Sequence, residues 1–301
     1  MKKIILIIGP FIIPILSFSQ TQKIDTNYAT AVVSADWMPD GRSMLIAVVK
    51  YHKTNPGFTS KVFRYELNSK QLIYLFDNAG NLAPSPGGKT IAFLRRDDKI
   101  RSDIYFYNVE TKNETVFKTD TLKKNALSWS PDGKKLIYNA GYPDKKDHSK
   151  VEVCVVDIAA KKTKRITHSG KNKSYSPEWC PDSKRIVYYL EKDDGRDQIW
   201  LTDLNGSFHT NLTNDTTTHN YFPGWLDEKT IFYIQSPETL MFMNTDGSKR
   251  TKVDGIKGQQ PKYNGVNGLF VYEADNTIVL YDWKKKTATV ILDGAKMIEH
   301  Y

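Results

Sequence analysis

The chain has 301 residues, of which 40% are hydrophobic and 26% charged, and its formal net charge is +9. This length fits one large or two ordinary globular domains, and the 12% of aromatic residues favours a strand-rich fold. After the first twenty residues no apolar run is long enough to cross a bilayer, which excludes a later membrane-spanning helix.

The N-terminus has the three parts of a secretory signal peptide. Two lysines precede an apolar stretch over residues 4–16, and small residues follow at positions 17 and 19. The alternative is a membrane anchor, but a span needs about 20 apolar residues, and two prolines interrupt this stretch. We predict a signal peptide over residues 1–19, cleaved before Gln20. No cysteine lies there to carry a lipid, so the expected product is periplasmic or secreted, is not a lipoprotein and has a net charge of +7.

The rest of the chain consists of repeats of one unit. The clearest copy is Leu127-Ser-Trp129-Ser-Pro131-Asp-Gly133-Lys. Similar or decayed copies begin at Ala35, Ala83, Pro177, Pro223 and Pro261. The positions aligned with the tryptophan are 37, 84, 129, 179, 225 and 263, at steps of 47, 45, 50, 46 and 38 residues. A strand-rich period in the forties is typical of a propeller blade.

Each copy predicts a tight hairpin between two strands. Proline presets the backbone at the second turn position, aspartate tolerates the third, and glycine takes the left-handed conformation that closes the turn. β-Branched or aromatic runs follow the turns over residues 44–49, 90–94, 136–138, 186–190, 230–234 and 269–272. Third strands are expected over residues 62–67, 104–109, 151–158, 198–204, 240–244 and 278–282, each followed by a polar turn and a short fourth strand. The sequence therefore predicts an all-β, six-bladed propeller with four antiparallel strands per blade over residues 20–301.

Two features of this ring stay open at the level of sequence. Either residues 28–33 supply an outer strand to the last blade, or residues 287–292 complete that blade without help. The two cysteines, Cys154 and Cys180, could form one disulfide, but buried free thiols are favoured.

The repeat resembles that of the TolB-type propeller, whose signature is a Trp-Ser-Pro-Asp-Gly-Lys hairpin, and the resemblance covers nearly the whole mature chain. It implies the propeller fold and, as a habit of the family, a partner bound over the propeller mouth. TolB itself carries an α/β domain ahead of its propeller, whereas here the first repeat begins about fifteen residues after the signal. A role in the Tol–Pal envelope machinery is therefore not expected.

Strand order predicts which face of the propeller carries function. Antiparallel blades place all Pro-Asp-Gly hairpins on one face, and the longer, variable loops on the other, where binding usually resides. Polar residues that enter the innermost strands on the variable face should ring the axis. They are Ser34, Asp36, Asn81, Asn125, Tyr175, Glu178, Asn220, Tyr221, Gln259 and Gln260. Such a funnel could bind a peptide or a sugar by hydrogen bonds, or the residues could merely satisfy strand ends and channel water.

A basic residue follows the hairpin in five blades: Arg42, Lys89, Lys134, Lys184 and Lys229. These residues could dock an anionic lipid or glycan, or simply keep strand edges and turns soluble. Nucleic acid is not an expected partner, because an exported protein rarely meets it.

The sequence carries no catalytic motif. Gly41-Arg-Ser43 lacks the final glycine of a nucleophile elbow and lies in a hairpin. His52, His148, His168 and His219 fall at different radii of the variable face, so no zinc site is predicted. Asp193, Asp194 and Asp197 lack the oxygen cage that calcium needs. We therefore expect no cofactor and no metal.

The favoured interpretation is a non-catalytic, protein-binding module or scaffold of the cell envelope or secreted space. The alternative is a carbohydrate-binding or carbohydrate-cleaving propeller, since two acids brought together by a fold leave no sequence motif. A purely structural subunit of an envelope complex is the third hypothesis.

Overall fold

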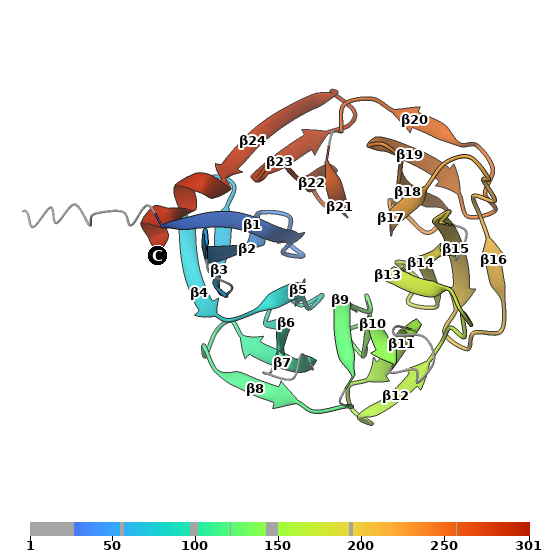
Figure 1. The fold of residues 1–301 in the computed structure, drawn as a ribbon, viewed down its shortest axis with the longest axis horizontal. Coiled ribbons are helices and arrows are strands. Elements are labelled where there is room, and N and C mark those ends of the chain that lie inside the picture. The colour runs from blue at the N-terminus through green and yellow to red at the C-terminus, as the bar shows by residue number, and fades with distance from the viewer. Residues whose placement is uncertain are drawn as a thin grey trace, which may run out of the picture.

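The computed structural model describes residues 27–54, 57–96, 102–120, 122–142, 150–192, 195–256 and 258–301. They form six four-stranded antiparallel sheets arranged as blades around a central axis, as Figure 1 shows. The all-β, six-bladed prediction is thereby confirmed. The predicted signal peptide, residues 1–19, lies outside the described residues.

Each blade is built from four consecutive strands, with the first strand innermost. Blades 1 to 3 comprise β1 (Tyr28–Trp37), β2 (Ser43–His52), β3 (Phe58–Glu66), β4 (Leu72–Asp77), β5 (Gly80–Pro84), β6 (Thr90–Arg96), β7 (Ser102–Asn108), β8 (Glu114–Phe117), β9 (Lys123–Trp129), β10 (Lys135–Tyr142), β11 (Lys150–Asp157) and β12 (Lys162–Arg165). Blades 4 to 6 comprise β13 (Lys173–Trp179), β14 (Arg185–Glu191), β15 (Gln198–Asp203), β16 (His209–Asn211), β17 (Asn220–Trp225), β18 (Thr230–Gln235), β19 (Thr239–Asn244), β20 (Thr251–Val253), β21 (Gln259–Asn264), β22 (Leu269–Ala274), β23 (Thr277–Asp282) and β24 (Thr287–Asp293). A 3₁₀ helix, η1 (Gly294–His300), follows β24.

The hairpins between the first and second strands have the predicted turn chemistry. Gly133 adopts a φ of 71°, in the left-handed region that favours glycine. The carboxylate of Asp132 accepts a hydrogen bond of 3.0 Å from the backbone N–H of Lys134, which locks the turn. Ser183 takes the same left-handed conformation, with a φ of 59°, in the copy that has lost its glycine.

The hydrophobic core is divided into six clusters, and each cluster lies between two neighbouring blades. The four tryptophans of the repeat lie at equivalent positions beside the axis, as predicted. Each indole N–H donates to a backbone carbonyl of the preceding blade: Trp37 to Lys262 (3.1 Å), Trp129 to Ala83 (3.0 Å), Trp179 to Ser128 (3.3 Å) and Trp225 to Glu178 (3.2 Å). The repeated tryptophan therefore joins blades to one another as well as filling the core.

The ring closes without strand exchange, because β24 completes blade 6 and β1 is the innermost strand of blade 1. Of the two closures left open by the sequence, the one in which residues 28–33 supply an outer strand is wrong. Side chains join the two blades instead. Asn276 accepts from the N–H of Val32 (2.9 Å) and donates to the carbonyl of Thr30 (3.2 Å), so that its amide covers the edge of β1. Met297 of η1 is buried in the cluster between these blades.

Replacing Asn276 by glycine should lower the free energy of unfolding by about 2 kcal/mol, because two hydrogen bonds across the seam are lost. Glycine suits the left-handed φ of 61° at this position, so backbone strain does not contribute. Urea denaturation measures the effect. The matched control is Asn214→Gly, which has the same residue type at a φ of 41° in a loop far from the seam. Equal stability of the two variants would contradict a role of Asn276 in closing the ring.

Cys154 and Cys180 are buried, form no disulfide and lie in separate core clusters. Cys180 Sγ also accepts a hydrogen bond of 3.3 Å from the Arg185 guanidinium.

Candidate functional site

A ring of backbone bulges forms the entrance to the axis on the face of the variable loops, which we call the mouth face. The pairing of the first two strands shifts register in every blade. In five blades the bulge holds a residue other than glycine in the left-handed conformation, always three positions before the aligned aromatic position: Asn81, Ala126, Ser176, Phe222 and Gln260. Left-handed residues of this kind store backbone strain and are concentrated at functional sites.

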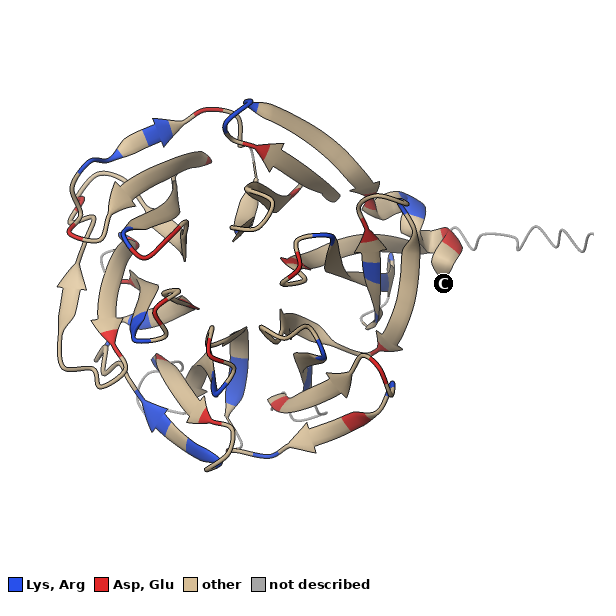
Figure 2. Cartoon of the chain, turned by 180° about the vertical axis from the view of Figure 1, so that it is seen from behind, with Lys and Arg blue, Asp and Glu red and all other residues tan. Residues whose placement is uncertain are grey.

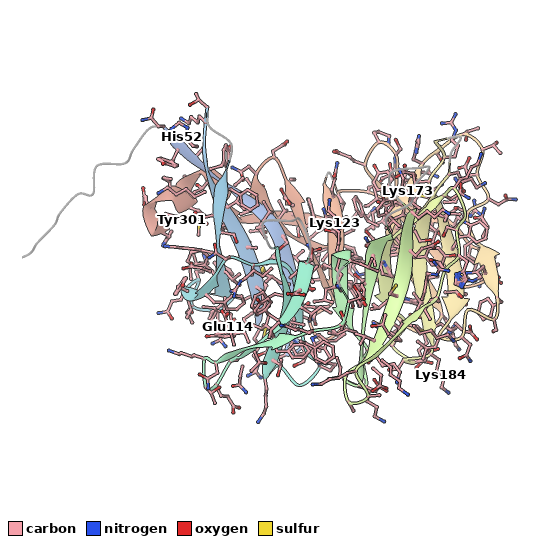
Figure 3. All side chains as sticks on the ribbon, turned by 60° about the horizontal axis from the view of Figure 1, so that its bottom comes forward. His52, Glu114, Lys123, Lys173, Lys184 and Tyr301 are labelled. Carbon is pink, nitrogen blue, oxygen red and sulfur yellow. The ribbon has the colours of Figure 1, made fainter. Side chains whose placement is uncertain are left out.

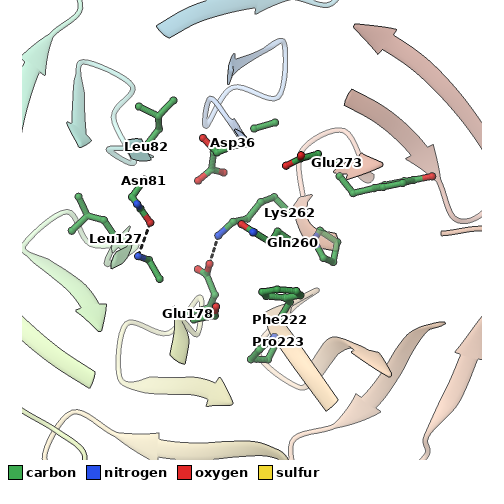
Figure 4. Close-up of a pocket in the computed structure, with 16 residues that line it drawn as sticks. Asp36, Asn81, Leu82, Leu127, Glu178, Phe222, Pro223, Gln260, Lys262 and Glu273 are labelled. Carbon is green, nitrogen blue, oxygen red and sulfur yellow. Dashed lines mark hydrogen bonds and ion pairs between the residues drawn. The ribbon is translucent and has the colours of Figure 1, made fainter. Parts of the chain in front are cut away.

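These five residues and Ser34 of blade 1 line a cavity on the mouth side of the axis, together with Asp36, Glu178, Lys262 and Glu273, as Figure 4 shows. We call it the axial cavity. The bulges bring the side chains of all six blades to its wall. One contact links neighbouring blades directly, because the Asn81 side chain accepts a 2.7 Å hydrogen bond from the N–H of Ala126.

Charged residues lie along the axis below the axial cavity. The position immediately before the aligned aromatic residue holds, in chain order, Asp36, Ala83, Ser128, Glu178, Gly224 and Lys262. The Lys262 amine donates to Glu178 Oε1, and the Ser128 hydroxyl donates to Glu178 Oε2 at 3.1 Å. Asp36, Glu178 and Lys262 line both the axial cavity and a second cavity toward the hairpins, so they lie where the two cavities meet. We call these three residues the waist.

Burial and neighbouring charges shift the pKa values of Asp36 and Lys262 at the waist. Burial raises the pKa of Asp36 to about 6, an effect that Lys262 opposes and Glu178 increases. Burial acts to lower the pKa of Lys262, but Glu178 and Asp36 together hold that pKa above its usual value. Burial also raises the pKa of Glu273. Lys262 is therefore charged at neutral pH, whereas Asp36 titrates only slightly below it.

This shift makes stability depend on pH. The folded protein binds the Asp36 proton more tightly than the unfolded chain, in which the pKa has its ordinary value of 3.8. The contribution of Asp36 to stability therefore rises as pH falls from about 7 toward 4, and ionisation above pH 6 opposes folding. Asp36→Asn should accordingly be more stable than the wild type at about pH 7.5, with the difference shrinking by about pH 4.5. Urea denaturation of both proteins across this range measures it, and a difference that grows as pH falls would contradict the assignment.

The structure brings part of the predicted site together. Ser34, Asp36, Asn81, Glu178 and Gln260 line the axial cavity. The other predicted residues do not line it: Asn125, Tyr175, Asn220, Tyr221 and Gln259. Asn220 is fully buried, and its amide oxygen accepts from Gln235, so its position indicates a structural role.

The two predicted tyrosines belong to an aromatic group beside the cavity. Tyr175 lies 5.5 Å from Tyr189, which lies 5.9 Å from Phe222 of the cavity wall, and Phe222 lies 5.1 Å from Tyr221 between ring centroids. The Tyr221 hydroxyl donates to the Pro237 carbonyl at 3.0 Å. The aromatic surface thus extends from the cavity over blades 4 and 5.

Sequence reasoning missed Lys262, Ser128, Phe222 and Glu273. Lys262 and Ser128 could have been found, because both stand directly before the aligned aromatic position, as Asp36 and Glu178 do. Phe222 and Glu273 carried no such indication, since their place in the cavity wall depends on a bulge and on the end of a second strand.

Within the described ranges, no three histidine, cysteine, aspartate or glutamate side chains come together in a way that could hold a metal ion. His219 contacts Asp197 at 3.2 Å, whereas His148, Asp193 and Asp194 lie outside those ranges. Among the same residues, no helix is long and apolar enough to cross a membrane.

The opposite, hairpin face carries charges of both signs. Figure 3 places Lys184 of this face away from His52, Lys123 and Lys173. Arg42, Lys134, Lys184 and Lys229 each stand two residues after an aspartate whose carboxylate accepts their backbone N–H. Lys89 pairs with Glu110 at 3.2 Å. The basic ring is therefore interleaved with acidic side chains, as the alternating blue and red of Figure 2 shows.

Six four-stranded blades around a polar and charged axial cavity define the molecule as a six-bladed β-propeller. The model of the TolB β-propeller domain family matches residues 83–289, more than half of the chain. The protein therefore belongs to the TolB-type propeller family.

One relative is an uncharacterized protein of Agrobacterium fabrum, 26% identical over 205 residues. The match spans 62% of this chain and 60% of that protein's length. Among solved structures, TolB from Acinetobacter baumannii matches with a TM-score of 0.62 at 14% identity, covering 87% of this chain and 79% of that one. Oligogalacturonate lyase from Vibrio parahaemolyticus matches with a TM-score of 0.59 at 13% identity, covering 88% and 79%. At these identities the structural matches show the shared fold alone.

Proposed function

We propose that this protein is a non-catalytic binding module of the cell envelope or secreted space that holds a segment of a protein partner at the mouth face. The observation that carries this proposal is the axial cavity, where strained bulges from five blades present amides, a hydroxyl and an aromatic ring beside the carboxylates of other lining residues. The predicted signal peptide supports an exported location, and membership of the TolB-type family supports a propeller that binds protein.

The chemistry of the mouth suits an extended peptide. Gln260 and Asn81 offer amide groups at the cavity wall, and the neighbouring tyrosines offer large amphipathic surfaces of the kind enriched in protein interfaces. The Lys262–Glu178 pair and Asp36 supply charges of both signs at the base of the cavity. A peptide entering the mouth would thus meet aromatic contacts first and charged groups at the waist.

The test compares the two faces. Tyr175→Ala, Tyr221→Ala and Gln260→Ala should each weaken binding of the partner by about tenfold, because truncated interface tyrosines commonly cost more than 1 kcal/mol. The combined hairpin-face variant Lys89→Gln, Lys134→Gln and Lys184→Gln is the control and should leave affinity nearly unchanged. The partner is first identified by envelope cross-linking and mass spectrometry in the native organism, and affinity is then measured by calorimetry with purified proteins. Loss of binding in the lysine variant alone would assign the functional site to the hairpin face.

A carbohydrate-binding or carbohydrate-cleaving propeller is the second candidate. It is favoured by one observation, namely that Asp36, whose burial raises its pKa to about 6, lies at the waist beside Glu178, so two carboxylates share one cavity. Glycan-array binding, or release of reducing ends that is lost in both Asp36→Asn and Glu178→Gln, would support this candidate over the first.

The basic residues of the hairpin face could also dock on an anionic lipid or glycan surface, an alternative that the sequence left open. The paired aspartates and Glu110 weigh against it, because they offset the charge of the basic ring. Sedimentation with anionic vesicles tests it directly.

A further inference from the structure

Blade 1 differs from the other blades at its mouth end. Its innermost strand β1 begins nine residues before Trp37, whereas the innermost strands of the other blades begin four to six residues before the aligned position. At about 3.3 Å per residue, the extra length corresponds to about 10 Å or more of strand. The ends of β1, β2 and β3 together form what we call the blade 1 flap, and Figure 3 shows His52 at its tip with Tyr301 beside it.

Most of the exposed large hydrophobic side chains among the described residues belong to blade 1. Ten large hydrophobic side chains are exposed among the described residues, and six of them belong to blade 1: Tyr28, Val33, Tyr51, Phe58, Ile73 and Tyr74. Phe58, at the start of β3, is 66% exposed. Single exposed hydrophobic residues are ordinary, but a concentration of them on one blade marks an interaction surface.

Two lysines alternate with tyrosines across this blade, from Tyr28 on its innermost strand to Tyr74 on its outermost strand. The Lys50 amine lies 4.8 Å from the ring centre of Tyr28 and 5.6 Å from that of Tyr301. The Lys61 amine lies 4.7 Å from the ring centre of Tyr301 and 5.8 Å from that of Tyr74. Cation–π contacts orient the amines but leave their positive charge in place.

A recess between these residues is lined by Tyr28, Lys50, His52, Gly57, Phe58, Thr59 and Tyr301. No acidic side chain is among these lining residues. This composition contrasts with the hairpin face, where each basic residue has an acidic neighbour. The recess therefore combines the amine of Lys50 with an exposed phenyl ring, whereas Lys61 lies outside the recess, opposite Asp77 of the neighbouring strand.

The flap also connects to the axial cavity. A groove between the flap and blade 2 is lined by Val33, Val49, Phe58 and Leu94 on its apolar side and by Ser34 and Asn81 at its inner end. Ser34 and Asn81 line the axial cavity as well, and Phe58 lines the recess as well. One continuous surface thus leads from the axis, past Phe58, to Lys50.

We propose that the blade 1 flap is a second docking surface, specific for an acidic segment of a protein partner that places one apolar side chain against Phe58. Charge complementarity selects the acidic residues, which approach Lys50 and Lys61. The exposed phenyl ring favours a protein over an anionic membrane or glycan, because it needs an apolar side chain to cover it. The inference rests on the proposed protein-binding function, extending the contact from the axis to the rim.

The experiment uses three synthetic pentapeptides as probes: Glu-Glu-Phe-Glu-Glu, the same peptide with serine for phenylalanine, and the same peptide with lysine for glutamate. Binding to the folded protein is measured by peptide NMR at low and at moderate salt. The first peptide should bind at least fivefold more tightly than either of the others, and its affinity should fall as salt rises. Phe58→Ser and the double variant Lys50→Gln, Lys61→Gln should each weaken it by about fivefold or more.

The matched control is Lys134→Gln, Lys184→Gln on the hairpin face, which should leave peptide binding unchanged. Because Lys50 and Lys61 also contact Tyr301, thermal unfolding checks that the double lysine variant is still folded. The Phe58 ring is exposed, so Phe58→Ser is expected to fold normally and provides an independent test. The inference would be overturned if the acidic and basic peptides bound equally well. It would also be overturned if the protein bound no peptide but bound phosphatidylglycerol vesicles, and these variants lost the vesicle binding. The proposed function would survive that outcome if Tyr175→Ala and Gln260→Ala still weakened the partner.

Discussion

Replacing Gly224 by alanine is expected to lower the free energy of unfolding by about 3 kcal/mol, the upper part of the range for an overpacked core. A Cβ atom at this position would lie 2.1 Å from the ring of Phe232, far inside van der Waals contact. That ring cannot retreat easily, because it packs edge to face against Phe270 with a centroid distance of 5.1 Å in the core between blades 5 and 6. Urea denaturation measures the loss.

Gly80→Ala is the matched control, since that glycine also lies in an innermost strand but has open space where its Cβ would be. A second variant, Gly224→Ala with Phe232→Leu, should recover part of the stability by removing the obstructing ring. If Gly224→Ala were as stable as Gly80→Ala, the close approach of Phe232 to the innermost strand would be wrong.

Lys124→Met should destabilise the protein by about 2–3 kcal/mol, because it removes a buried amine that bonds several backbone carbonyls and the partly exposed Asp120 carboxylate. The Lys124 side chain is fully buried, and its amine contacts the Asp120 carboxylate at 2.7 Å. The same amine donates to the carbonyls of Ser102, Asp120 and Leu122, at 3.1, 3.0 and 3.2 Å. Methionine fills the space but removes the donor to the three carbonyls, while the Asp120 carboxylate still accepts from Tyr138 and from the N–H of Leu122.

The connection into blade 3 depends on this amine, so Lys124→Met should also disturb Ala126 and the wall of the axial cavity. Partner binding and urea denaturation measured on the same variant test both effects. Lys123→Met, at the exposed neighbouring position, is the control and should change stability by less than about 0.5 kcal/mol. Asp120→Asn should cost less than Lys124→Met, because the carbonyl contacts remain.

The blades could be predicted from sequence because their chemistry is local. Proline, aspartate and glycine act within four consecutive residues, so the hairpin at Asp132 and Gly133 forms wherever that order occurs. The aromatic residue at a fixed distance from the turn, as in Trp129 and Trp179, repeats with the blade and so reveals the number of blades. The placement of the hairpins on one face of the propeller and of the longer loops on the other likewise followed from the antiparallel order of the strands.

The site could be predicted only in part. Asp36 and Glu178 were singled out as polar residues expected where innermost strands begin. They lie one residue before the end of β1 and β13 instead, and they line the axial cavity. Tyr175 and Tyr221 were placed beside the axis, but the bulge at Ser176 and Phe222 leaves these two tyrosines outside the cavity wall. A bulge moves every following side chain to the other face of the sheet, and no single residue type predicts where a bulge occurs.

Tertiary structure alone decided which residues meet. Glu178 and Lys262 are 84 residues apart and come from blades 4 and 6, yet closure of the ring joins them at the waist. Two further sets of contacts join the ends of the described chain in the same way. Asn276 bonds the backbone of β1, and Tyr301 lies beside Lys50 and Lys61 of blade 1. Turn chemistry and hydrophobic alternation act between neighbours in the chain, and the sequence therefore determined the blades. Contacts across the axis and the seam depend on the curvature of all six blades together, and only the closed ring could determine them.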